Sequence, residues 1–277
     1  MPAGNARAVE KARGLPADVV ILDLEDSTAP EAKPAAREAA AQAVRAGGFG
    51  ARELVLRVNG LDTPWGVQDL TAAAQAAPDA ILVPKVTSPA DLAAYRRAAG
   101  PKPALWAMIE TCQAMFALGE LARASVGEGV DCWVIGTNDL VKEMRCRLDA
   151  HRTALLPALS LSVMAARGQG LAILDGVYND IPDLDGLARE CRQGAELGFD
   201  GKSLIHPTHL DVANRAFSPE PGAVAWARTV AAAFDAPQNA GQGVMKVEGR
   251  MVERLHLAQA RQLIAVADAI AAREAPP

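Results

Sequence analysis

The stretch VVILDLED, residues 19–26, constrains the fold more than any other part of this 277-residue chain. It is an apolar run, rich in β-branched residues, that ends in carboxylates. This pattern predicts a strand covered on both faces, as in a parallel α/β sheet. Asp23, Glu25 and Asp26 lie at its C-terminal end, where such folds carry out their chemistry. Acids so close together repel one another unless a cation, an arginine or hydrogen bonds offset their charge. The alternative is a solvated turn between a strand and a helix.

Composition narrows the class of protein. With 50% hydrophobic residues, the chain can bury the core of one large α/β domain with an extension. A net charge of −5 argues against nucleic acid as the main partner, because a polyanion needs a basic face. The four cysteines lack C-x-x-C spacing, and the N-terminus lacks an apolar signal segment. The longest apolar segment, residues 154–174, is interrupted by proline, arginine and glycine. We therefore expect a cytoplasmic protein that does not span a membrane.

Segments with strand character alternate with helical patterns along most of the chain, which predicts a parallel sheet. Nearly every expected strand ends in a polar or charged residue, the layout of the active face of a (β/α)₈ barrel. No G-x-G-x-x-G follows a strand, which disfavours a dinucleotide-binding sheet. The expected strands are 19–26, 54–59, 80–86, 104–111, 132–137, 171–177 and 201–206, and the expected helices are 5–13, 31–46, 66–77, 89–99, 112–123, 153–168 and 184–197.

A closed barrel needs eight strands, and the sequence offers seven. From about residue 223 the pattern changes to an amphipathic helix, a PQNAGQG loop and a final helix over about 253–273 with apolar residues at 3–4 spacing. The segment VMKVEGRMVE between them is open to an extended piece or a turn. We expect a barrel domain over 1–222 and a helical extension over 223–277, which serves as a lid or contacts a neighbouring subunit.

Two carboxylates at neighbouring strand ends indicate a metal site. Glu110 ends one expected strand and Asp139 follows the next, 29 residues further on, which is about one βα unit. Their side chains should therefore lie side by side. Hard oxygen ligands with room for waters suit Mg²⁺, which takes one or two protein carboxylates.

Three basic groups also stand at strand ends. Arg57 can hold a substrate carboxylate through two hydrogen bonds, or it forms a structural ion pair with the nearby acids. Lys85 binds an anion or, as the safer interpretation, pairs with an acid, and His206 is favoured as structural. Because no nucleophile elbow, phosphate loop or catalytic triad is present, any hydrolysis would use water activated by a metal or a carboxylate.

A series of motifs runs through the chain: DLEDS followed by P-E-x-K, RVNG, VPKV, AMIET, GTNDL, DGVYND, GKSLIHP and a terminal GRMVE. Together, and in this order, they resemble the citrate lyase β-subunit/malyl-CoA lyase superfamily over essentially the whole chain. The resemblance implies a TIM (β/α)₈ barrel that assembles as a homotrimer or hexamer. It also implies Mg²⁺, with Mn²⁺ as a substitute, and CoA thioesters of short 3-hydroxy acids as substrates. The GTNDL, DGVYN and GKSLIHP variants look most like the malyl-CoA thioesterase branch.

The same resemblance assigns roles to single residues. Glu110 and Asp139 match the metal ligands, and Arg57 matches the arginine that holds the 2-oxo-acid carboxylate. Glu25 and Asp26 match the acids that orient metal-bound waters. Contacts to the CoA phosphates are expected from two residues of the first helix, Arg7 and Lys11.

This chain departs from the family's pattern at both ends. The family's acid/base is an Asp that reaches over from a neighbouring subunit, and here Glu253 stands in its place. A shift of about one ångström can cost about a hundredfold in rate, so Glu253 weakens the case for C–C cleavage. The family also opens with a strand resembling R-S-x-L-F-x-P-G, where this chain has only MPAG. We therefore expect a truncated first barrel strand. Either the start is assigned inside a longer gene, which we favour, or the barrel is open at one seam.

The leading functional hypothesis is a Mg²⁺-dependent lyase that cleaves malyl-CoA, methylmalyl-CoA or citramalyl-CoA by retro-Claisen chemistry. The alternative is a (3S)-malyl-CoA thioesterase with the same metal site, in which Glu253 activates water. A further alternative is an accessory or inactive subunit of the citrate lyase type.

Overall fold

The computed structural model describes residues 1–274, which divide into two compact units. The first unit is Met1–Ala216, here called the barrel unit, and the second begins at Phe217 and is called the C-terminal unit. Within the described chain, no helix is long and apolar enough to cross a membrane.

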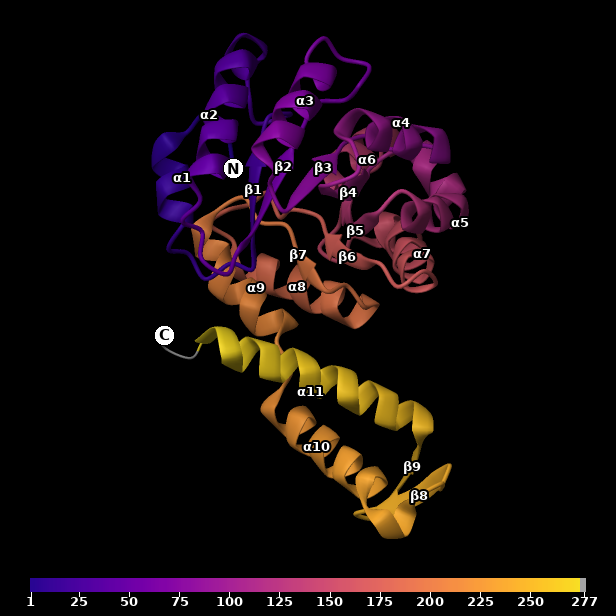
Figure 1. Cartoon of the computed structure of the whole chain (residues 1–277). Helices are drawn as coiled ribbons and strands as arrows, with labels where there is room; N and C mark the ends of the chain where they lie inside the picture. The colour runs from indigo at the N-terminus through magenta and orange to yellow at the C-terminus, as the bar shows by residue number, and fades with distance from the viewer. Residues whose placement is uncertain (275–277) are drawn as a thin grey trace. The chain divides into compact units, whose positions relative to one another are not determined.

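In the part of the chain that the structure describes, the barrel unit contains one seven-stranded parallel sheet whose strands follow one another in chain order. The sheet curls into a TIM-type half-barrel with helices around it, as the sequence predicts (Figure 1). Side chains of β2 to β5 fill its interior, among them Val55, Leu82, Trp106, Met108 and Val134. The strands are β1 Val19–Asp23, β2 Glu53–Arg57, β3 Ala80–Val83, β4 Ala104–Ile109, β5 Val130–Ile135, β6 Ala172–Asp175 and β7 Gly201–Lys202.

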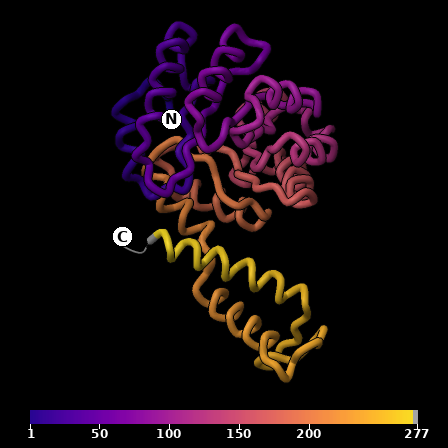
Figure 2. The backbone as a smooth tube through the Cα atoms, in the orientation of Figure 1, coloured from indigo at the N-terminus to yellow at the C-terminus, as the bar shows by residue number. Residues whose placement is uncertain are grey.

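The sheet is open between β7 and β1, as the missing eighth strand predicts. On the edge of β1 opposite β2, Pro2 forms an isolated parallel bridge with Asp23. The Ala3 N–H donates to the Asp23 carbonyl at 3.0 Å, and the Asp23 N–H donates to the Met1 carbonyl at 2.9 Å. In Figure 2 the N-terminus is marked among the indigo segments of the barrel unit. Across the opening, the Asn214 side chain donates to the Pro16 carbonyl at 2.9 Å.

Most helices of the barrel unit begin and end close to the predicted residues. Helices α4 and α8 match the prediction residue for residue, and α1 is capped by Asn5, whose side chain accepts from the Ala8 N–H. The short helices α6 and α9 were not predicted. The bounds are α1 Ala6–Ala12, α2 Lys33–Ala46, α3 Gly66–Ala76, α4 Pro89–Ala99, α5 Cys112–Gly127, α6 Thr137–Met144, α7 Leu156–Arg167, α8 Leu184–Leu197 and α9 Leu210–Phe217.

The C-terminal unit consists of α10 Pro221–Asp235, the antiparallel strands β8 Val244–Val247 and β9 Arg250–Glu253, and α11 Arg254–Glu274. The segment left open between an extended piece and a turn is therefore a β-hairpin. Its tip has positive φ at Glu248 and Gly249 (46° and 82°), which suits a tight hairpin turn. Its own apolar cluster holds the unit together, and the predicted lid or subunit contact stays a prediction.

Candidate functional site

A cavity of about 390 Å³ lies at the C-terminal ends of the barrel strands. Its apolar wall includes Ile21, Leu82, Met108 and Ile135. Its polar wall contains Asp23, Asp26, Arg57, Glu110 and Asp139. The structure therefore brings most of the predicted strand-end residues together around one space.

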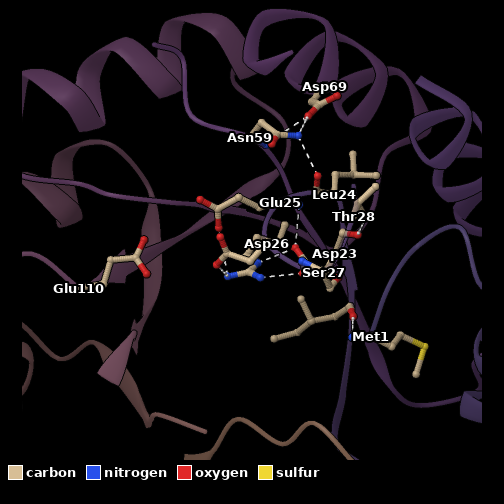
Figure 3. Close-up of polar contacts among 12 residues, drawn as sticks. Met1, Asp23, Leu24, Glu25, Asp26, Ser27, Thr28, Asn59, Asp69 and Glu110 are labelled. Atoms are coloured by element: carbon tan, nitrogen blue, oxygen red, sulfur yellow. Dashed lines mark hydrogen bonds and ion pairs between the residues drawn. The ribbon is translucent and has the colours of Figure 1, made fainter. Parts of the chain in front are cut away.

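Arg57 organises the acids at the end of β1 and just after it, Asp23, Glu25 and Asp26, which are labelled in Figure 3. Its Nε and Nη2 each lie 2.6 Å from an oxygen of Asp23, which gives a two-point ion pair. Its Nη1 lies 3.1 Å from Glu25 Oε2 and 3.3 Å from Asp26 Oδ2. Burial alone would raise the pKa of Asp23, but the hydrogen bonds and charge of Arg57 lower this pKa to about 2. The two-point face of the guanidinium is thus directed at Asp23, and Nη1 faces the other acids.

Glu25 is buried between two cations. Lys85 Nζ lies 2.9 Å from its Oε1, which agrees with the expectation that this lysine pairs with an acid. Arg57 approaches Oε2 as an ion pair without hydrogen-bond alignment, so this buried oxygen accepts no hydrogen bond from the residues that the structure describes. Burial raises the pKa of Glu25, and the nearby cations offset only part of that rise.

Glu110 extends from the end of β4 toward this cluster, as Figure 3 shows. Its Oε1 accepts from the Lys85 main-chain N–H at 2.8 Å. Burial, followed by the charge of Glu25, raises the pKa of Glu110 to about 7. Gly136, after β5, leaves it space, because a Cβ there would lie 2.3 Å from Glu110 Oε2. The glycine of the GTNDL motif is therefore required by the carboxylate beside it.

Asp139 lies in the first turn of α6 and lines the same cavity as Glu110. Among the described residues, no group of three or more His, Cys, Asp or Glu side chains is arranged to hold a metal ion. A Mg²⁺ site does not require such a group, because this ion keeps several waters and takes one or two carboxylates. The hard oxygen donors of Glu110 and Asp139, both facing a cavity large enough for waters, fit this ion.

The backbone that presents Glu25 is fixed from behind by a buried lysine that sequence reasoning did not assign. Lys33, the lysine of P-E-x-K, donates to the carbonyls of Leu24 and Glu25 and to Asn59 Oδ1 at 2.7–2.9 Å. Asn59 in turn donates to Asp69 at 2.6 Å. The P-E-x-K and RVNG motifs therefore act together as a support for the DLED loop.

Other predicted residues are not among those that line the cavity. Arg7 and Lys11 are exposed on α1 and are absent from the cavity wall, so their contact with CoA stays a prediction. Glu253 ends β9 in the C-terminal unit, with an exposed side chain, and its catalytic role also stays a prediction. His206 accepts from the Thr208 N–H at 3.3 Å, a local turn contact of the kind expected for a structural histidine.

The structure adds polar groups that the sequence did not single out as a pair. Asn138, beside Asp139, exchanges hydrogen bonds with Asn179 at 3.2 and 2.7 Å, which joins the first turn of α6 to the loop after β6. The available signal was the position of both residues just after expected strands, in GTNDL and DGVYND. Pairing between amides that lie 41 residues apart cannot be recognised from one sequence.

Comparison with known proteins agrees with this architecture. The model of the HpcH/HpaI aldolase/citrate lyase family matches residues 1–207. A (3S)-malyl-CoA thioesterase of Cereibacter sphaeroides is 47% identical over 272 residues, which cover 98% of this chain and 94% of the relative. Citrate lyase subunit beta of Escherichia coli is 32% identical over 284 residues, which cover 99% and 93%.

A solved structure gives the same result at the level of the fold. The protein CitE of Mycobacterium tuberculosis, in complex with magnesium, acetoacetate and coenzyme A, superposes with a TM-score of 0.78 and 31% identity. The match covers 97% of this chain and 96% of that chain. The family model, the two relatives and the shared fold confirm the resemblance seen in the motifs: this chain belongs to the HpcH/HpaI aldolase/citrate lyase family.

Proposed function

We propose that this protein is a Mg²⁺-dependent thioesterase that hydrolyses (3S)-malyl-CoA to malate and CoA. The observation that supports it most is the 47% identity, over nearly the whole chain, to a (3S)-malyl-CoA thioesterase. This relative favours the alternative from the sequence over the lyase that the sequence placed first. The carboxylates and the arginine that line the cavity at the strand ends support this proposal.

Glu110 and Asp139 would hold the Mg²⁺ ion in this proposal. When bound, the ion polarises a substrate oxygen and offsets the negative charge that develops on it. Glu25 and Asp26 would orient waters at the site. Arg57 Nη1 would donate to the carboxylate of the malyl group, since Nε and Nη2 are engaged by Asp23.

In the hydrolysis, a water oxygen forms a bond to the thioester carbonyl carbon and the C–S bond breaks. A carboxylate takes one proton of that water and returns it to the departing CoA sulfur. We assign this proton transfer to Glu253 of a neighbouring subunit. The assignment requires a homo-oligomer, a trimer or hexamer, in which the C-terminal unit of one copy reaches the cavity of the next.

The test is a product assay with malyl-CoA and Mg²⁺ that follows free thiol, malate and glyoxylate together. We expect thiol and malate without glyoxylate, and loss of both after metal chelation. Glu110→Gln should remove the activity, whereas Glu120→Gln, the same change at an exposed position on α5, should not. Thiol release that survives Glu110→Gln in full would contradict the assigned site.

A C–C lyase is the second candidate, supported by the 32% identity to a citrate lyase subunit. A lyase would release glyoxylate without free thiol in the same assay. If the folded oligomer forms neither product, both enzyme hypotheses are wrong for this substrate, and the accessory-subunit alternative is favoured.

A further inference from the structure

Lys85 has a backbone conformation that lysine adopts rarely. It follows β3 and Pro84, and its φ is +50°, one of five positive values at non-glycine residues in the described part of the chain. Such conformations are strained and persist where surrounding contacts impose them. At Lys85 both the main chain and the side chain make contacts with carboxylates.

These contacts connect acids that come from separate strands. The Lys85 N–H donates to Glu110 Oε1 at 2.8 Å, and its Nζ lies 2.9 Å from Glu25 Oε1. Glu110 follows β4, and Glu25 lies in the loop after β1. One residue therefore fixes the orientation of a proposed metal ligand with its backbone and neutralises a second acid with its ammonium group.

The two cations of the cluster differ in their freedom to move. The Arg57 side chain is 16% exposed and is held by Asp23 at two points, whereas the Lys85 side chain is 45% exposed and ends on Glu25. The described cluster comprises five carboxylates, namely Asp23, Glu25, Asp26, Glu110 and Asp139, and two side-chain cations, so its negative groups outnumber the positive ones even when the N-terminal ammonium of Met1 is counted. An arriving divalent cation is attracted by the acids and repelled by the ammonium group.

We propose that Lys85 is a positioning residue with a divided role: its N–H holds Glu110 in place, while its ammonium group leaves Glu25 when the divalent cation binds. The inference rests on the proposed function, because it takes Glu110 and Asp139 as the ligands. In the metal-free protein the Lys85 ammonium group neutralises Glu25, and the divalent cation has to displace this ammonium group when it binds.

The test is a binding titration of the full-length protein with Mn²⁺, followed by the electron paramagnetic resonance signal of the free ion. Lys85→Met removes the charge, and Lys85→Gly removes it while relieving the positive φ, so the second variant guards against misfolding of the first. Both should bind Mn²⁺ about tenfold more tightly than the wild type. Lys85→Arg keeps the charge and should bind with the wild-type affinity, as should Lys102→Met, a matched change at an exposed lysine.

The outcomes separate this inference from the proposed function. If the wild type binds Mn²⁺, Glu110→Gln abolishes the binding, and Lys85→Gly binds with equal or weaker affinity, the role of Lys85 is wrong while the metal site stands. If the wild type does not bind Mn²⁺, the metal site and the role of Lys85 both fall. A purely structural lysine would lower the affinity when replaced, because its loss would disorder Glu110.

Discussion

Asp23→Asn tests whether the Asp23–Arg57 pair stabilises the site and the strand ends around it. Asp23 is 4% exposed, and in the wild type it accepts from both Arg57 and Ser27. The substitution replaces one acceptor oxygen by an amide nitrogen, which cannot accept a hydrogen bond. This nitrogen would face the hydrogen-bond donors of Arg57 or Ser27. A folded-state pKa of about 2, against an ordinary value of 3.8, corresponds to about 2 kcal/mol of stability at neutral pH.

Because the pKa is lowered on folding, this contribution is present above about pH 4 and is lost as the pH falls toward about 2. We therefore expect Asp23→Asn to lower the free energy of unfolding by about 2–3 kcal/mol at about pH 7, and by less at each step below about pH 4. Urea denaturation of both proteins from about pH 7 down to about pH 2 measures this difference. The control is Asp26→Asn, at a carboxylate that is 57% exposed and 3.3 Å from the same guanidinium. The control should cost at most about 0.5 kcal/mol.

Two results would refute the reasoning. One is a loss of unfolding free energy in Asp23→Asn that is the same at every pH, since the charge of Asp23 would then not be the cause of the loss. The other is an equal loss in both variants, since burial and the two-point geometry would then add nothing to simple proximity.

The remaining predictions concern the neighbourhood of Glu110. Burial and the charge of Glu25 raise its pKa to about 7, so in the metal-free protein stability should fall as the pH rises from about 4.5 through 7. Glu110→Gln should remove this slope and raise the free energy of unfolding at about pH 8 by up to about 3 kcal/mol, measured by denaturation in chelator; an unchanged slope would show that another group titrates. Gly136→Ala places a Cβ 2.5 Å from Glu110 Cβ and should lower turnover about a hundredfold, whereas Gly127→Ala, with nothing within 4 Å, should leave it intact. Equal turnover in both glycine variants would mean that the position of Glu110 is not critical.

The barrel strands were predictable because their apolar runs are long and rich in β-branched residues. The alternation of these runs with helical patterns specifies a parallel sheet, whatever the details of packing. The predicted ends reached beyond the observed ones: β1 ends at Asp23 and β3 at Val83, since the following residues turn to line or support the cavity. Helices α6 and α9 were missed because eight residues give too few turns for a periodic pattern, whereas the seven-residue α1 begins after a capping Asn5.

The site was predictable at the level of residues but not of contacts. Position at the strand ends is enough to predict that Arg57, Glu110 and Asp139 share one cavity, because parallel strands end at the same edge of the sheet. The partner of each group could not be predicted, because it depends on side-chain distances of a few ångströms. The engagement of Arg57 by Asp23 and the turned backbone of Lys85 belong to this second kind of information.

The unbalanced charge of the cavity has a consequence for the order in which ligands arrive. Its wall holds the carboxylates of Asp23, Asp26, Glu110 and Asp139 against two cations, the Arg57 guanidinium and the Met1 ammonium, so the cavity presents a negative field to any approaching molecule. A CoA ester of a dicarboxylic acid is itself an anion, and its approach to such a field is slowed. A divalent cation at Glu110 and Asp139 would cancel most of this field. Under the proposed function, the metal therefore binds before the substrate. The substrate binds poorly to a site that has lost its metal.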